Sequence, residues 1–192
     1  MIAGLPTVDI ANSILSSSCA RDVLSLIIPL IKIKNYKSQI PFPVVIFDVV
    51  EKVVELKNTV PTHELSETEI LIFDQLINLE GFQLPTVSAI FHFCHPSSYP
   101  IVDRNIQASC GLLATEFSEE LNRISLPILP AANTSIENKL GKYRNFISFL
   151  TEVKNLHNNQ HQTEYSFRSL DQELMVYGVP NMKVKAENHA NN

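Results

Sequence analysis

The residue best suited to do chemistry is Asp103, which lies in the stretch HPSSYPIVDRN (95–105). It follows an apolar triplet and directly precedes Arg104. A carboxylate at the start of a helix accepts hydrogen bonds from backbone N–H groups, and the helix dipole favours its charged form. A carboxylate held in this way can stabilise a positive charge that develops on a substrate. An Asp at such a place is also a common helix cap without chemistry, so both interpretations stay open.

A second group, His92, Cys94 and His95, has metal-binding residue types. Offsets of two and three residues turn these side chains toward different faces of a helix, and no second pair of ligands follows. A metal site is therefore not expected, and no sequence motif calls for a cofactor. The chain has three cysteines, Cys19, Cys94 and Cys110. Their odd number and wide spacing argue against a disulfide framework.

The elements that position Asp103 are predicted to be helices. The sequence SETE opens a helix over 66–79 as a capping box, because its Ser and Glu side chains each bind a free backbone N–H. Pro85 suits the first turn of the next helix, 85–94, where a missing N–H costs nothing. The link that contains Gly81 is so short that the two helices form a hairpin. The chain then restarts as a helix at Asp103.

Apolar spacing predicts further helices and no alternating strand, so the expected fold class is all-α, with about seven to nine helices. The stretch from Pro41 is rich in Val and Ile, which favours a strand, but its length and spacing favour a helix. The other predicted helices are one after Ser18 that is kinked at Pro29, one opened by a second capping box at 134–137, and a short one over 169–177. The polar stretch 155–165 is expected to be a loop.

Length and composition indicate one folded domain over 1–180, followed by a polar tail, 181–192. The chain has 192 residues and a net charge of −5, which counts against a nucleic-acid partner unless a few basic residues gather on one surface. No run reaches the length of apolar residues that a membrane span needs, and the N-terminus lacks the pattern of an export signal. A cytoplasmic protein without a membrane partner is expected, and no feature specifies an oligomeric state.

The order of helix, short Gly turn, helix, YPIVD and helix resembles the helix-hairpin-helix base-excision DNA glycosylase superfamily. The matching residues are Gly81, the run TVSAI (86–90) and the YPIVD segment (99–103), so that the resemblance extends over about 66–115. A later stretch, 170–178, looks like the helix that closes the same lobe in such enzymes. The resemblance implies a two-lobed helical fold with a helix-hairpin-helix.

The resemblance also implies a function, the hydrolysis of the N-glycosidic bond of a flipped damaged or mispaired base in double-stranded DNA. Asp103 would be the catalytic residue, because cleavage builds positive charge on the sugar. His92 and Tyr99 would lie at the substrate pocket. The residues that the resemblance assigns to DNA binding are Gly81, Phe82, Gln83, Thr86 and Arg104.

Three departures from the family pattern matter. Bifunctional members have a nucleophilic Lys where this chain has Pro85, so that any activity would be hydrolytic and monofunctional. Gln83 replaces the second glycine of the hairpin turn, which weakens a close approach to phosphate. The iron–sulfur cysteines of some members are absent from the sequence.

These departures, together with the acidic charge, leave a second hypothesis open, an inactive glycosylase-fold module that binds or regulates. A third is an unrelated helical enzyme. The second half of the chain has one loose group of basic residues, Lys139, Lys142, Arg144 and Arg168. Such a group suits a solvated helix face as well as a DNA-binding one.

Overall fold

The computed structural model describes residues 45–56, 65–79, 81–175 and 177. Every regular element within these ranges is a helix, which confirms the all-α prediction for this part of the chain. The predicted helix after Ser18, Cys19 and the tail 181–192 lie outside the described residues. The helices are α3 (Val45–Glu55), α4 (Glu67–Ile77), α5 (Leu84–Cys94), α6 (Arg104–Glu116), α7 (Ser118–Leu121), α8 (Ile136–His161) and a last helix over 167–175.

Local signals fix the starts of α4 and α5. Ser66 caps α4 in the predicted capping box: its hydroxyl accepts from the Glu69 N–H, and the Glu69 carboxylate accepts from the Ser66 N–H at 2.6 Å. Pro85 lies in the first turn of α5, as predicted. The short connection between the helices contains Gly81 at φ 77°, a backbone conformation that glycine adopts without steric cost.

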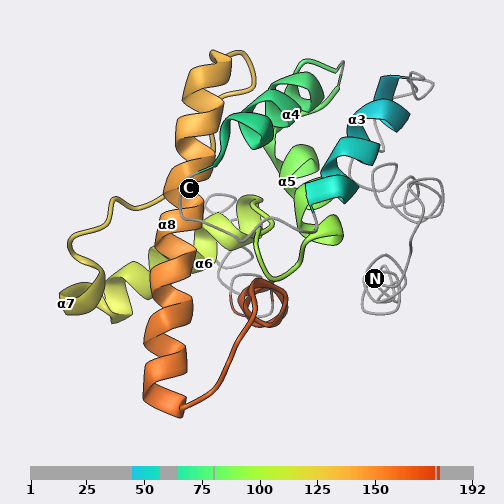
Figure 1. Cartoon of the computed structure of the whole chain (residues 1–192). Coiled ribbons are helices and arrows are strands. Elements are labelled where there is room, and N and C mark those ends of the chain that lie inside the picture. The colour runs from blue at the N-terminus through green and yellow to red at the C-terminus, as the bar shows by residue number, and fades with distance from the viewer. Residues whose placement is uncertain (1–44, 57–64, 80, 176, 178–192) are drawn as a thin grey trace, which may run out of the picture.

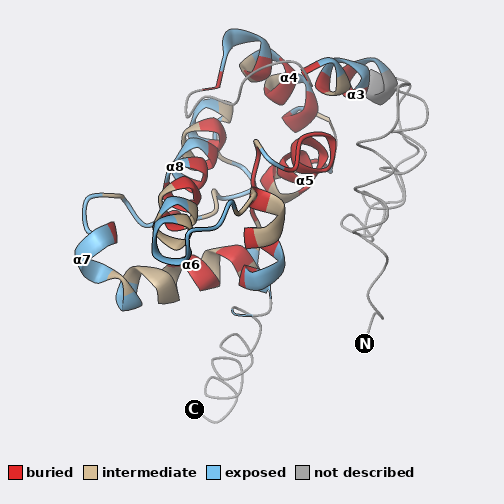
Figure 2. Cartoon of the chain, turned by 60° about the horizontal axis from the view of Figure 1, so that its bottom comes forward, coloured by how far each residue is buried: buried red, intermediate tan, exposed pale blue. Residues whose placement is uncertain are grey.

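The helix α5 is buried along nearly its whole length (Figure 2). All of its side chains except Pro85 are buried, and it contacts α3 and α4. The long helix α8 contacts α4 toward one end and also contacts α7, which in turn lies next to α6 (Figure 1). α8 therefore joins the group α3, α4 and α5 to the pair α6 and α7.

The core face of α8 carries apolar residues at helical spacing, as expected of the helix predicted after 134–137; the first of them, Ile136, is half-buried. Leu140, Tyr143, Ile147 and Leu150 are all buried. The Tyr143 ring stacks on Phe73 of α4, with ring centroids 5.8 Å apart. Such packing between distant helices, rather than helix propensity, supplies most of the stability of an amphipathic helix.

Two predictions about α8 are wrong. Its N-cap is Ser135, whose hydroxyl accepts from the Asn138 N–H at 3.2 Å, so the expected capping box at 134–137 does not form. The Thr134 hydroxyl binds the Asn138 side-chain amide at 2.6 Å. The helix also continues to His161, so that 155–161 of the polar stretch expected to be a loop are helical, while 163–165 are not. Leu156 packs against the core and keeps this end of the helix attached.

The end of α8 lies within the stretch that was predicted to be a loop. The helix stops at His161, after which Gln162 adopts a left-handed backbone conformation with φ 53°. Asn158 then binds the chain as it leaves the helix, since its side-chain oxygen accepts from the Tyr165 N–H at 2.8 Å. Among the described helices, none is both long enough and apolar enough to cross a bilayer.

Candidate functional site

Asp103 is the N-cap of α6, as the sequence predicts. Its Oδ1 accepts hydrogen bonds from the backbone N–H groups of Asn105 at 2.9 Å and Ile106 at 3.1 Å. These two N–H groups belong to the first turn of the helix, where no carbonyl of the helix itself can bind them. The residue is half-buried, so that the carboxylate is held by the helix while part of the residue reaches the surface. Such a side chain is held in a fixed position by the start of the helix.

The turn between α4 and α5 exposes Gly81 and buries its neighbour Phe82. Phe82 is only 5% exposed and its N–H donates to the Leu79 carbonyl at 3.0 Å, which ties the turn to the end of α4. Gln83 has φ −127° and ψ 170°, an extended conformation open to any residue. The missing second glycine therefore places no strain on this turn.

The residues that were assigned to DNA binding are not equally accessible. Gly81 and Arg104 are exposed and Gln83 is half-buried, whereas Phe82 and Thr86 lie inside the core. Arg104 directly follows Asp103 at the start of α6. The accessible residues of the predicted set thus lie at two helix starts, those of α5 and α6.

His92 and Tyr99, which were assigned to the substrate pocket, lie together but in the core. His92 is 0% exposed and Tyr99 is 4% exposed. The His92 Nδ1 lies 2.7 Å from the Tyr99 carbonyl oxygen, and because a carbonyl only accepts, Nδ1 carries the hydrogen. The Tyr99 hydroxyl donates to the Glu69 carboxylate. Both side chains are therefore buried and bonded to other groups of the protein.

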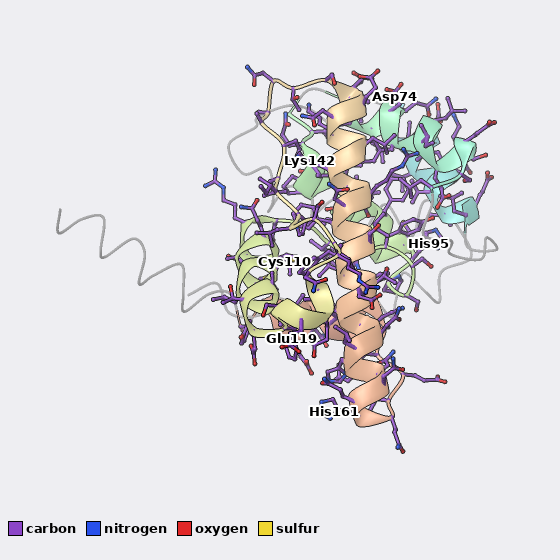
Figure 3. All side chains as sticks on the ribbon, turned by 90° about the vertical axis from the view of Figure 1, so that its left-hand side faces the viewer. Asp74, His95, Cys110, Glu119, Lys142 and His161 are labelled. Atoms are coloured by element: carbon purple, nitrogen blue, oxygen red, sulfur yellow. The ribbon has the colours of Figure 1, made fainter. Side chains whose placement is uncertain are left out.

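The basic residues of the second half do not form one surface. Lys139 is buried, and Arg168 lies 3.4 Å from the Asp171 carboxylate. Arg144 is exposed and Lys142 is half-buried. Figure 3 shows Lys142 toward the α4 end of α8, with Cys110 of α6 and Glu119 of α7 further along the helix.

The residues with metal-binding side chains do not converge in the described part of the chain, where no group of three or more could hold an ion. The His95 Nε2 lies 2.5 Å from the Val53 carbonyl, so His95 ties the end of α5 to α3 while His92 binds the Tyr99 carbonyl. Cys94 and Cys110 are both buried. Burial raises the pKa of Cys110 to about 12, which keeps this thiol protonated and unreactive at neutral pH.

Two residues near Asp103 were not singled out by the sequence. Ser88 and Tyr143 are each 0% exposed, and each binds a backbone group of the segment that leads to Asp103. In the sequence they look like ordinary members of apolar helix faces. The available signal was their polar atoms, because a buried hydroxyl nearly always has a hydrogen-bond partner.

Comparison with protein-family models, with curated proteins and with solved structures finds no match to this chain.

Proposed function

We propose that this protein is a monofunctional DNA glycosylase of the helix-hairpin-helix type that acts in the cytoplasm. It hydrolyses the N-glycosidic bond of a damaged or mispaired base that has been flipped out of double-stranded DNA. The proposal includes the two-lobed arrangement of such enzymes. In support of that arrangement, α3, α4 and α5 contact one another, α6 contacts α7, and α8 contacts both groups.

The observation that carries the proposal is the Asp103 carboxylate. It lies at the start of α6, bound by two backbone N–H groups through Oδ1, and it is half-buried. Its position is fixed before a substrate binds, so that the protein need not reorganise as charge develops in the transition state. A carboxylate held in this way supports the proposal, because glycosidic bond cleavage builds positive charge on the sugar that such a group stabilises.

The chemistry follows from this carboxylate. The C1′–N bond breaks with its electron pair going to the base, and the deoxyribose becomes cationic. Asp103 stabilises that cation and orients a water molecule. The water oxygen adds to C1′, and the proton that the water loses ends on the released base. No covalent intermediate is needed. This agrees with Pro85, which stands where bifunctional members of the glycosylase superfamily have their nucleophilic lysine.

The hairpin supplies the second support. Gly81 is exposed at φ 77°, and the turn leads directly into α5. Backbone N–H groups in such turns and at helix starts bind phosphate without reading the base sequence. Contact at this turn would hold one DNA strand while Asp103 faces the sugar of the extruded nucleotide.

The test is base release from a panel of oligonucleotide duplexes that carry single damaged or mispaired bases. Released base leaves an abasic site, which alkali converts to a strand break that a gel resolves. We expect wild type to act on at least one duplex, and we expect Asp103→Asn to lower kcat by about 100-fold or more. Asn is as good an N-cap as Asp, so this substitution removes the charge and keeps the cap.

Ser135→Ala is the matched control, because it removes the N-cap of α8 without changing a charge. Its activity should stay within about twofold of wild type at a temperature where both are folded. Equal activity of wild type and Asp103→Asn on the cleaved duplex would refute the role of Asp103. A wild-type protein that releases no base from any duplex of a broad panel would refute the enzymatic function.

A second candidate is an inactive module with the same fold, favoured by the acidic charge and the scarcity of accessible basic side chains. Lys139 is buried and Arg168 is paired with Asp171. Such a module would bind duplex DNA weakly at physiological salt. A titration of duplex affinity against salt separates the two, because an enzyme with several phosphate contacts loses affinity steeply as the salt concentration rises.

A further inference from the structure

The segment that leads into Asp103, residues 99–102, is buried and its backbone is bound by side chains of two helices. This segment has no regular structure, so its polar groups need partners from elsewhere in the fold. The bonds join the His92 ring to the Tyr99 carbonyl at 2.7 Å, the Tyr143 hydroxyl to the Pro100 carbonyl at 3.2 Å, and the Val102 N–H to the Ser88 hydroxyl at 3.1 Å.

Ser88 connects this segment to the start of α5. Its hydroxyl oxygen accepts a hydrogen bond from the Val102 N–H. The same hydroxyl donates its single hydrogen to the Pro85 carbonyl, with 3.2 Å between the two oxygen atoms. The Val102 carbonyl, at 3.5 Å, is the poorer acceptor for that hydrogen. Pro85 belongs to the first turn of α5, and Val102 precedes Asp103. One fully buried hydroxyl thus links the hairpin to the residue before the carboxylate.

Tyr143 binds the same segment from α8. Its ring is fully buried and stacks on Phe73, and its hydroxyl donates to the Pro100 carbonyl. Burial raises the pKa of Tyr143 well above its ordinary value, and the nearby Tyr99 and Glu69 raise it further. The hydroxyl therefore keeps its hydrogen and stays a donor throughout the physiological range.

We propose that Ser88 and Tyr143 are positioning residues, which fix Asp103 relative to the hairpin turn that holds the DNA strand. The inference rests on the proposed glycosylase function and names two residues that act through Asp103. Without either hydroxyl, the segment 99–102 loses a buried bond and the carboxylate moves relative to the sugar. A displacement of about 1 Å at a reacting centre can lower a rate by about 100-fold.

The experiment compares Ser88→Ala and Tyr143→Phe with two matched controls. Tyr165→Phe removes the same hydroxyl from a tyrosine that binds Glu173 on the exterior. Ile147→Val removes one methyl group from the buried face of α8 and tests whether general destabilisation has the same effect. For each variant, kcat and KM for base release are measured at a temperature where all proteins are folded.

We expect Ser88→Ala and Tyr143→Phe to lower kcat at least about 10-fold while KM changes less than about twofold. Both controls should leave kcat within about twofold of wild type. In the Asp103→Asn background the same two substitutions should cause no further loss, because a residue that acts through the carboxylate has nothing left to position. An equal loss in both backgrounds, or an equal loss in Ile147→Val, would overturn the proposal.

A second measurement does not depend on activity. The amides of Asn105 and Ile106 bind Asp103 Oδ1, so their hydrogen exchange reports directly on the carboxylate. Exchange at these amides should accelerate at least about 10-fold in Ser88→Ala relative to Ile147→Val. Equal exchange in the two variants would overturn the positioning role. Absence of base release by wild type would refute the proposed function and leave this exchange result to decide the positioning role.

Discussion

The cap of α6 allows the structural role of Asp103 to be separated from its charge. Asp103 Oδ1 accepts two backbone N–H groups, at 2.9 and 3.1 Å, and the residue is half-buried. Asp103→Ala removes the acceptor together with the charge. Asp103→Asn keeps an oxygen acceptor in the same place and removes only the charge. If the residue serves the fold alone, either Asp or Asn is sufficient at this position.

The expected magnitudes follow from this geometry. Loss of an N-cap costs about 0.5–2 kcal/mol of unfolding free energy, and two bonds at a half-buried site place Asp103→Ala near the upper end. Asp103→Asn loses only the attraction between a negative charge and the helix dipole, about 0.3–1 kcal/mol at low salt. Ser135→Ala, which removes a single bond of 3.2 Å at an exposed cap, should cost about 0.5–1 kcal/mol. For a chain of this size each kcal/mol lowers Tm by about 2–4 °C.

Urea unfolding at neutral pH, followed by circular dichroism, measures all three variants, and a thermal scan checks their order. The loss in Asp103→Asn should shrink further in high salt, since screening weakens the interaction of a charge with the dipole. If Asp103→Asn costs as much as Asp103→Ala, the charge itself stabilises the fold. The reasoning that the carboxylate is kept for a reaction would then be refuted.

Two further predictions concern stability. Because burial raises the pKa of Cys110 from 9.0 to about 12, the unfolded chain loses this proton first, and the unfolding free energy should fall by about 1.4 kcal/mol per pH unit between those values. Denaturant titrations of wild type and Cys110→Ala from pH 8 upward test this, and an unchanged slope in the variant would contradict it. Gly81→Ala should lower stability by about 1–2 kcal/mol, since φ is 77° there. In Gly111→Ala an added Cβ meets no atom within 4 Å, so the same change should raise stability by about 0.5–1 kcal/mol. Equal effects of the two glycine substitutions in thermal unfolding would show that the turn conformation is not what Gly81 provides.

The sequence alone predicts the features that depend on a few neighbouring residues. The capping box at Ser66, Pro85 in the first turn of α5, and Asp103 as a cap were all confirmed. Each involves bonds between residues within about four positions, so the local chain contains the whole interaction. The apolar stripe of α8 was predictable for the same reason, since helical periodicity places it on one face.

Tertiary structure decides what the sequence left open or got wrong. The polar end of α8 was predicted to be a loop, but packing of Leu156 keeps it helical to His161. Thr134 and Ser135 are both able to cap a helix; the folded chain uses Ser135, and the Thr134 hydroxyl binds the Asn138 side chain instead.

The surroundings of Asp103 depend most strongly on packing. Ser88 binds Val102 across 14 positions, and Tyr143 binds Pro100 across 43. His92 and Tyr99, which were expected at a substrate pocket, are buried in the core. Bonds over such separations form only when α5 and α8 pack around residues 99–102, so a local sequence pattern cannot predict them. The sequence thus determines that a carboxylate starts α6, and the folded chain determines what holds it in position.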